Sequence, residues 1–367
     1  MDRLRCHRFW PWLWGRAGAG WDLLFFPLTL LAWIYGGGVR ARAGMYRVGL
    51  RKTRRVDCQV VSIGNLAVGG VGKTPFVLFL AEQYRARGIA VGVASRGYGR
   101  EGGGERLAVS DGTRLLATPE TAGDEPYLIA ARLVDVPVVV SADRHDGCRW
   151  LVEQYGVAVI LLDDAFQHLA LHRDLNLLLL DGNAPFGNGR LLPRGLLREP
   201  PSALSRADAL FFSRATVGVD IQISNAACPV FSFALVPTSL VHVATHAVSP
   251  LSDLAGRDVF ALCGIARPDR FITSLERLNM HVAARQTFPN HYRYTATDIA
   301  RLRREAGTLP IITTEKDAVK LARYDQVADL DCRAIRIAVQ MHSGGWEELL
   351  FGSSMERGLL RASSPIG

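Results

Sequence analysis

Short runs of Val, Ile and Leu alternate with longer mixed segments through the middle of the chain. The runs cover residues 60–63, 89–95, 136–140, 157–162, 175–180, 209–213 and 230–235. Strands of a parallel sheet are covered by helices on both faces, so they are apolar throughout and do not alternate. The pattern therefore predicts an α/β fold with a mostly parallel sheet, with helices after the first run, near residue 124 and at residues 143–155.

A second set of elements follows Pro237, where the rhythm resets. Strands are predicted at residues 259–264, 282–288, 311–314 and 334–339, and helices at residues 268–280 and 297–306. The residues from about Ser353 onward are small and polar, as is typical of a loose tail. We therefore expect an N-terminal segment (1–55), a core domain (56–236), a smaller C-terminal α/β domain (237–352) and a tail (353–367).

The N-terminal segment combines tryptophan, arginine and one apolar run. Five of the seven tryptophans lie in the first 33 residues, and the run extends from Leu23 to Tyr35. Trp and Arg beside an apolar helix are typical of a segment that lies in a membrane interface. A spanning helix needs roughly 20 apolar residues, so this shorter run predicts a monotopic or re-entrant helix on a membrane surface.

A signal peptide and a buried helix are the two alternatives to a membrane-interface helix. A signal peptide also has a basic start and an apolar core, but no convincing cleavage site precedes the arginine cluster at residues 40–55. An apolar run of about 10–14 residues is also often a helix buried against its own domain. Both alternatives stay open on the sequence.

The net charge of +8 is concentrated at the N-terminus. Residues 1–56 hold eleven Arg or Lys and two Asp, a net charge of +9, so the rest of the chain carries −1. A nucleic-acid-binding domain carries basic residues on its folded surface, so we expect no nucleic-acid partner. The six cysteines show no paired spacing, which favours a reducing compartment over a disulfide framework or a zinc site.

A glycine-rich loop joins the first predicted strand to a helix. Glycines let consecutive backbone N–H groups converge on an anion, and the helix N-terminus adds positive potential. Lys73 can reach the outer phosphates of a nucleoside triphosphate, and the Thr74 hydroxyl can bind Mg²⁺. A chance turn is the simpler alternative, since Ala67 occupies the first glycine position of the usual motif. The flanking strand and helix favour a P-loop whose phosphate-binding residues are Gly64, Asn65, Gly69, Gly70, Val71, Gly72, Lys73 and Thr74.

Other polar residues lie next to predicted strands and helices. Asp163 and Asp164 end an apolar strand, where a carboxylate holds Mg²⁺ in P-loop enzymes, although a helix N-cap has the same pattern. Asp124 begins a helix, for which a capping carboxylate is the simpler interpretation. Arg144 follows a strand end, where ligands bind in open α/β sheets, although it also suits a solvated helix start. A single loop histidine such as His291 is more often structural than catalytic.

The motifs together resemble one family, the tetraacyldisaccharide 4′-kinases, which are the lipid A 4′-kinases of Gram-negative bacteria. The resemblance covers roughly residues 21–339 and follows the family's order. Two departures occur, with Ala165 where glycine is usual and Asn290 where aspartate is usual. The motifs are Gly64-Asn65, Gly69-Gly70-Val71-Gly72-Lys73-Thr74-Pro75, Ser95-Arg96-Gly97-Tyr98-Gly99, Gly123-Asp124-Glu125-Pro126, Asp163-Asp164-Ala165-Phe166-Gln167-His168, Arg173-Asp174, Gly187-Asn188-Gly189-Arg190-Leu191-Leu192-Pro193, Leu197-Arg198-Glu199-Pro200, Gly264-Ile265-Ala266-Arg267-Pro268, Phe288-Pro289-Asn290-His291 and Thr313-Thr314-Glu315-Lys316-Asp317.

The resemblance implies an ATP- and Mg²⁺-dependent lipid kinase at the cytoplasmic face of the inner membrane. Its acceptor would be the 4′-hydroxyl of a tetraacyldisaccharide 1-phosphate, and we expect a monomer. By similarity, Asp124 matches the catalytic base, His291 its partner and Lys73 the phosphate-binding lysine. The remaining implied residues are Arg144, Gln167 and His168 for the substrate, and Thr74, Asp163, Asp164 and Glu199 for the metal.

Two rival functions are weighed against this one. A P-loop kinase of a small soluble alcohol leaves the N-terminal segment without a role. A membrane-associated switch ATPase of the partitioning type has a signature lysine in its loop, at the position that Val68 occupies here. That residue argues against the switch ATPase.

Overall fold

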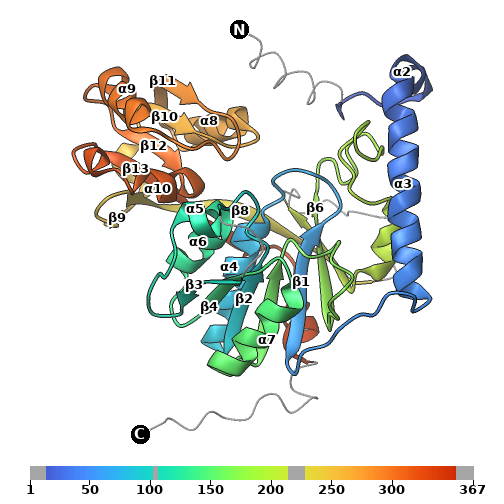
Figure 1. Ribbon diagram of the computed structural model, residues 1–367. Coiled ribbons are helices and arrows are strands. Elements are labelled where there is room, and N and C mark those ends of the chain that lie inside the picture. The colour runs from blue at the N-terminus through green and yellow to red at the C-terminus, as the bar shows by residue number, and fades with distance from the viewer. Residues whose placement is uncertain (1–13, 102–105, 214–227, 353–367) are drawn as a thin grey trace, which may run out of the picture.

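The computed structural model describes residues 14–101, 106–213 and 228–352. Within them, thirteen strands form one sheet of order β11-β10-β12-β13-β8-β7-β6-β1-β5-β2-β4-β3, with β9 paired to β8 (Figure 1). Neighbouring strands are parallel except β3 with β4, β8 with β13 and β8 with β9. This mostly parallel mixed sheet confirms the α/β class.

The core lobe, residues 59–213, contains the central strands and their covering helices. Residues Val61 and Ile63 of β1 pack with α4 and α6, whereas Val60 packs with α7 on the opposite face. This alternation explains why the strands are apolar throughout. The elements are β1 (Gln59–Asn65), α4 (Lys73–Ala86), β2 (Val91–Ser95), β3 (Leu107–Asp111), α5 (Pro119–Ala122), α6 (Asp124–Arg132), β4 (Pro137–Val140), α7 (Arg144–Tyr155), β5 (Val159–Asp163), β6 (Leu175–Asp181), η1 (Pro201–Arg206) and β7 (Ala209–Ser213).

The C-terminal lobe, residues 243–331, continues the same sheet and has two small cores of its own. It forms the upper left part of Figure 1. Two long antiparallel strands, β8 (Val230–His242) and β13 (Cys332–Met341), join it to the core lobe. Its elements are β9 (Val248–Ser249), η2 (Leu251–Leu254), β10 (Asp258–Cys263), α8 (Pro268–Arg277), β11 (His281–Thr287), α9 (Ala296–Ala306), β12 (Ile311–Thr314), α10 (Glu315–Leu321) and η3 (Asp325–Val327), with η4 (Glu348–Gly352) following β13.

The expected boundary between residues 236 and 237 lies inside β8. Pro237 pairs with Ile337 of β13, beside an irregularity in the register between these strands. Proline has no backbone N–H, but it is tolerated where the strand pairing is irregular. The sequence pattern therefore changes at Pro237 while the strand continues. The sequence patterns also missed the antiparallel edge strand β3, the short helices α5 and α10, and the full length of β8.

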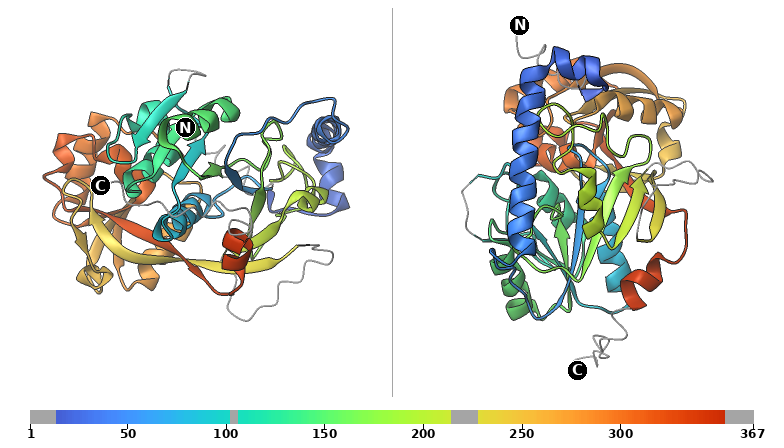
Figure 2. Two further views of the ribbon diagram at one scale, coloured as in Figure 1. Left: turned by 90° about the horizontal axis from the view of Figure 1, so that it is seen from below. Right: turned by 90° about the vertical axis from the view of Figure 1, so that its right-hand side faces the viewer.

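The N-terminal helices α2 (Ala19–Leu24) and α3 (Phe26–Arg47) lie along one side of the core lobe, as Figures 1 and 2 show. The buried residues of α3 are small ones, Thr29, Ala32 and Gly36. At Gly36, an added Cβ would lie 2.6 Å from the Leu191 side chain. Both Arg190 and Arg194 form ion pairs with Asp22 of α2. These contacts fix the helices against residues 188–198.

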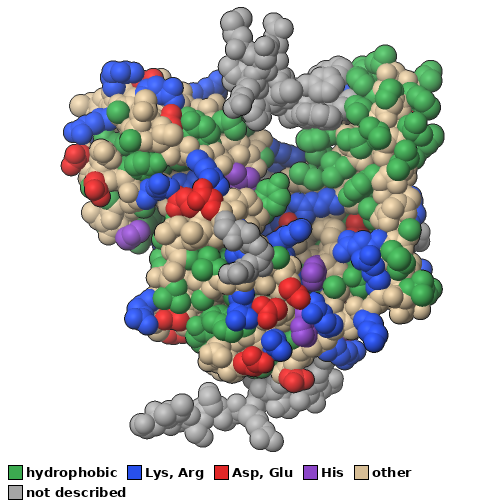
Figure 3. All heavy atoms as spheres, viewed as in Figure 1, with side chains coloured by type: hydrophobic (Ala, Val, Ile, Leu, Met, Phe, Trp, Pro, Cys, Tyr) green, Lys and Arg blue, Asp and Glu red, His purple; other side chains and the backbone are tan. Residues whose placement is uncertain are grey.

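The outward side of these two helices is apolar and exposed. Large apolar side chains cover the upper right of Figure 3 along α3. They include Leu23, Leu24, Phe26, Leu30, Leu31, Trp33 and Ile34. Among the described residues, none of the helices combines the length and the hydropathy that crossing a bilayer requires. Residues 1–13, the glycines at 102–104 and the expected tail at 353–367 lie outside the described residues.

Gly64 allows a test of the close packing between β1 and the backbone at Phe166. It lies inside β1, where an added Cβ would meet the backbone nitrogen of Phe166 at 2.7 Å. We expect Gly64→Ala to lower the free energy of unfolding by about 1–3 kcal/mol, because a rigid backbone must move. Gly70→Ala is the matched control, since a Cβ there has nothing within 4 Å. Urea unfolding measures both, and equal midpoints would contradict the packing argument.

Candidate active site

The glycine-rich loop leads from β1 into the N-terminus of α4. Gly69 and Gly72 have φ of 138° and 91°, values that glycine adopts without strain. Gly72 caps α4, so Lys73 and Thr74 form the first turn of the helix. The Lys73 ammonium donates to Asn65 Oδ1 at 3.1 Å. The loop, the helix N-terminus and the lysine thus converge as the sequence predicts for a phosphate site.

The segment 191–198 holds this loop from outside. Val68 N donates to Leu196 O at 2.8 Å, and Arg198 N donates to Leu66 O at 2.7 Å. On the inner side, Gln167 Nε2 donates to Asn65 O at 2.9 Å. Gln167, expected at the substrate, is therefore tied to the loop backbone. The loop takes its shape from contacts with these neighbours as well as from its glycines.

The paired carboxylates lie beside the lysine at the end of β5. Asp164 Oδ1 is 3.4 Å from Lys73 Nζ, and Arg198 donates to the same carboxylate at 2.9 Å. Burial raises the pKa of Asp164, but these two cations outweigh it and hold the pKa below its ordinary value. Burial and the nearby Glu125 and Asp164 charges raise the pKa of Asp163 to about 7.

Asp163 and Thr74 fit a metal site better than the remaining candidates do. Asp163 is 1% exposed, and its Oδ1 has no hydrogen-bond partner within the described residues. Thr74 is also buried. A buried, unpartnered carboxylate oxygen suits Mg²⁺, which binds proteins through one or two carboxylates and completes its shell with water and phosphate.

Glu199, which the resemblance also implies for the metal, has a protein partner in the structure. Its carboxylate is 3% exposed and forms an ion pair with Arg206 of η1. The structure thus gives this residue a different partner from the one the resemblance implies. In the described part of the chain, no cluster of three or more His, Cys, Asp or Glu could hold a metal by itself.

Arg144 and His168 both point into the core lobe. The Arg144 guanidinium donates to Asp163 O at 3.4 Å, and burial lowers its pKa. Burial, with the charges of Arg144 and Arg173, lowers the pKa of His168 to about 4, so its imidazole is neutral near pH 7. His168 Nε2 is buried without a hydrogen-bond partner among the described residues. It can therefore meet a ligand group, whereas Arg144 supports the end of β5.

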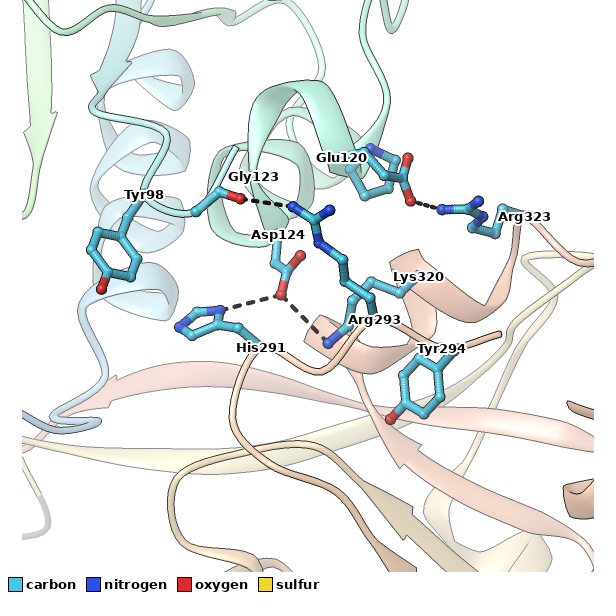
Figure 4. Close-up of a pocket in the computed structure, with 11 residues that line it drawn as sticks. Tyr98, Glu120, Gly123, Asp124, His291, Arg293, Tyr294, Lys320 and Arg323 are labelled. Carbon is cyan, nitrogen blue, oxygen red and sulfur yellow. Dashed lines mark hydrogen bonds and ion pairs between the residues drawn. The ribbon is translucent and has the colours of Figure 1, made fainter. Parts of the chain in front are cut away.

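Asp124 and His291 meet across the two lobes (Figure 4). His291 Nδ1 lies 3.2 Å from Asp124 Oδ2, although 167 residues separate them in sequence. Asp124 is the first residue of α6, and His291 follows β11 in the loop at residues 288–295. Around them is a pocket whose lining includes Tyr98, Glu120, Asp124, His291, Arg293 and Lys320.

Two neighbours from the C-terminal lobe, His291 and Lys320, lower the pKa of Asp124. Burial raises its pKa, but the hydrogen bond with His291 and the charge of Lys320 outweigh burial, so the pKa is lowered. The adjacent Glu125 forms an ion pair with Lys316 of α10. The Lys316 charge lowers the pKa of Glu125. Lysines of the C-terminal lobe thus favour the ionised form of these two carboxylates of the core lobe.

Sequence reasoning missed Arg198, Lys316 and Lys320 as site residues. Arg198 stands beside Glu199 in a recognised motif, and Lys316 is in the Thr-Thr-Glu-Lys-Asp run, so both had a signal. Lys320 had none, because its helix was not predicted. A second pocket is lined by residues 67–71 of the loop, by residues 179–181 and by Arg267.

Comparisons with known proteins show which family this chain resembles. The family model described as LpxK, tetraacyldisaccharide-1-P 4′-kinase, matches residues 24–353. The tetraacyldisaccharide 4′-kinase of Desulfatibacillum aliphaticivorans is 41% identical over 349 residues, which cover 90% of this chain and 93% of the relative. That of Geobacter sulfurreducens is 40% identical and covers 88% and 92%.

A solved structure extends the agreement to the fold. LpxK from Aquifex aeolicus, determined in complex with ATP, superposes with a TM-score of 0.74 at 33% sequence identity, covering 89% of this chain and 96% of that one. The match to the family model extends over α3 and both lobes. The chain therefore belongs to the tetraacyldisaccharide 4′-kinase (LpxK) family.

Proposed function

We propose that this chain transfers the γ-phosphoryl group of ATP to the 4′-hydroxyl of a tetraacyldisaccharide 1-phosphate in lipid A biosynthesis. The observations that carry the proposal are the Lys73–Asp164 contact at the phosphate loop and the Asp124–His291 pair at the boundary between the lobes. Phosphoryl transfer needs positioning, charge neutralisation and a base, and these residues supply all three.

The nucleotide phosphates would lie on the loop at residues 66–72 and the first turn of α4. The loop amides and the Lys73 ammonium would bind the β- and γ-phosphates. Asp163 and Thr74 would hold Mg²⁺, with Asp164 beside them, and the ion would neutralise charge on the transferred group. Glu199 would join this set through the carboxylate oxygen that does not face Arg206. The pocket beside Arg267 would accept the nucleoside part of ATP.

Asp124 would act as the base for the sugar hydroxyl. A hydroxyl is a poor nucleophile near neutral pH, so its proton must pass to a carboxylate as the new P–O bond forms and the bond to ADP breaks. The structure supports this role because Asp124 is ionised and lines a pocket. His291 would orient the carboxylate through the 3.2 Å contact.

The activity can be tested directly with labelled ATP and a tetraacyldisaccharide 1-phosphate. The wild-type protein should form a bisphosphorylated lipid, and Lys73→Ala should lower turnover by at least about 1,000-fold, because backbone amides cannot replace the cation at the transferring group. Folding of the variant is checked by its melting temperature. Wild-type turnover by a folded Lys73→Ala variant would remove the loop from the mechanism.

The pairing of Asp124 with His291 makes a separate prediction. Groups that act as a unit are not additive, so Asp124→Ala, His291→Ala and the double variant should lose similar factors in kcat, roughly 100-fold or more, with the KM for ATP little changed. Steady-state kinetics at saturating ATP measure this. A double-variant loss that equals the product of the two single losses would show that the residues act independently.

We further propose that the apolar side of α2 and α3 rests on the membrane that contains the lipid substrate. Large exposed apolar patches mark interaction surfaces, and exposed cations lie toward the C-terminal end of α3 and in the segment after it. Those cations are Arg40, Arg47, Arg51, Lys52, Arg54 and Arg55. An ATP-dependent enzyme needs the cytoplasmic face, so the inner leaflet of the inner membrane is the proposed site, with a monomer as the active unit.

Changing two residues of the patch tests this membrane contact. Trp33 and Ile34 are 65% and 64% exposed, so Trp33→Asp with Ile34→Asp removes apolar burial without disturbing the core. We expect co-sedimentation with vesicles containing anionic lipid to fall at least roughly tenfold, because each large apolar side chain contributes about 1.5–3 kcal/mol. Val248→Asp, at a residue 60% exposed on β9, is the control and should sediment as wild type. Equal loss in both would contradict the proposal.

A further inference from the structure

Lys320 is a buried lysine at the boundary between the lobes. It lies in the last turn of α10 and is 6% exposed. Its ammonium is 3.4 Å from Asp124 Oδ2, 3.1 Å from Asp317 Oδ1 and 3.1 Å from Tyr292 O, to which it donates. It also lies over the Tyr294 ring, 5.4 Å from the centroid. A buried ammonium that finds so many acceptors is held in one place.

We propose that Lys320 is a positioning residue for phosphoryl transfer, which holds one carboxylate oxygen of Asp124 so that the other faces the acceptor hydroxyl. The inference rests on the proposed role of Asp124 as the base. Both His291 and Lys320 contact Oδ2, as Figure 4 shows. Within the described residues, no hydrogen bond or ion pair involves Oδ1. The two contacts on one oxygen therefore fix the rotation of the carboxylate and leave the other oxygen available.

Asp317 fixes Lys320 from behind. This carboxylate is fully buried and accepts from Gly264 N at 2.9 Å, from Tyr294 Oη at 3.0 Å and from Thr314 Oγ1 at 2.7 Å. A carboxylate with this many donors cannot turn to follow a mobile partner. Lys320 is thus anchored to the C-terminal lobe, and only its approach to Asp124 depends on how the lobes meet.

The position of Lys320 makes the orientation of the Asp124 carboxylate depend on both lobes. Asp124 belongs to α6 of the core lobe, while Lys320 and His291 belong to α10 and the loop after β11 in the C-terminal lobe. When the lobes are apart, Asp124 loses both partners together. The carboxylate is then free to rotate and has lost the charge that favours its ionised form.

The remaining charged groups around Asp124 come as pairs and add little net charge. They are Glu125 with Lys316, Glu120 with Arg323, and Glu101 with Arg293. Asp317 adds a negative charge on the far side of Lys320, and Lys73 faces Glu125 from the loop. The Lys320 charge lowers the pKa of Asp124, and a base must be deprotonated to act. Removing the charge therefore raises this pKa and moves the acidic limb of the pH profile to higher pH.

The test compares pH profiles of kcat/KM for the lipid in Lys320→Met, Lys320→Arg and wild type. We expect Lys320→Met to lose roughly tenfold in kcat at pH 7, less than loss of the base itself, with its acidic limb at higher pH. Lys320→Arg keeps the charge and should keep the limb near the wild-type position. The KM for ATP should be unchanged, since ATP binds the loop in the core lobe. If Lys320→Met does not fold, Lys320→Gln keeps donors for Asp124 and Asp317 while removing the charge.

Two controls separate the possible failures. Arg323→Met removes another ion pair between the lobes, with Glu120, without contacting Asp124, and should leave the acidic limb in place. An equal shift in Arg323→Met, or an unshifted limb in the neutral Lys320 variants, would overturn the role of Lys320. Asp124→Asn tests the base itself. Wild-type turnover by Asp124→Asn would refute the proposed function, whereas an inactive Asp124→Asn with an unshifted Lys320→Gln would refute only this inference.

Discussion

The site draws residues from both lobes, and its geometry depends on the strands β8 and β13 that join them. They pair antiparallel from Arg333 with His242 to Met341 with Phe233, and this ladder carries one sheet from the core lobe into the C-terminal lobe. A flexible linker would leave the lobes free to rotate about several axes. A two-stranded ribbon is twisted and bends in few directions, so the C-terminal lobe can meet the core lobe in few ways. His291 and Lys320 therefore reach Asp124 reproducibly, although they lie far from it in sequence.

Ion pairs between the two lobes then favour the arrangement of the lobes in this structure. The core lobe presents Glu101, Glu120, Asp124 and Glu125 along one edge, and the C-terminal lobe presents Arg293, Arg323, Lys320 and Lys316 opposite them. On the opposite side of the cleft, Arg267 and Arg270 approach Asp181 at 3.5 Å. Each exposed pair contributes at most about 1 kcal/mol. These pairs therefore determine how the two lobes are aligned more than how tightly they associate. The pairs at Asp124 and Glu125 are partly buried, so separating them costs more, because each carboxylate then loses its compensating charge.

Sequence could predict the parts of this site that are local. The strand–loop–helix at Lys73 and the strand ending in Asp163 and Asp164 are contained in short segments, and the family resemblance added Asp124 and His291. The sequence could not predict where individual side chains point or which residues they contact. Arg144 begins a helix as a solvated residue would, yet it is buried and donates to Asp163 O. Glu199 stands in a motif, yet its carboxylate pairs with Arg206, seven residues later. The role of Lys320 depends on a contact between the two lobes, which no local sequence pattern predicts.

Two site residues are among the five described non-glycine residues with positive φ. Asp164 and His291 have φ of 49° and 58°, in the left-handed region that non-glycine residues rarely occupy. Each follows a strand, β5 or β11, and the positive φ turns the chain sharply so that the side chain faces the cleft. Such a conformation costs about 1–3 kcal/mol and persists only where other interactions over-determine it. For Asp164 these are Lys73 and Arg198, and for His291 the contact with Asp124. Because glycine would relieve the strain but supply no carboxylate or imidazole, the chain retains strained functional residues where the two lobes and the loop meet.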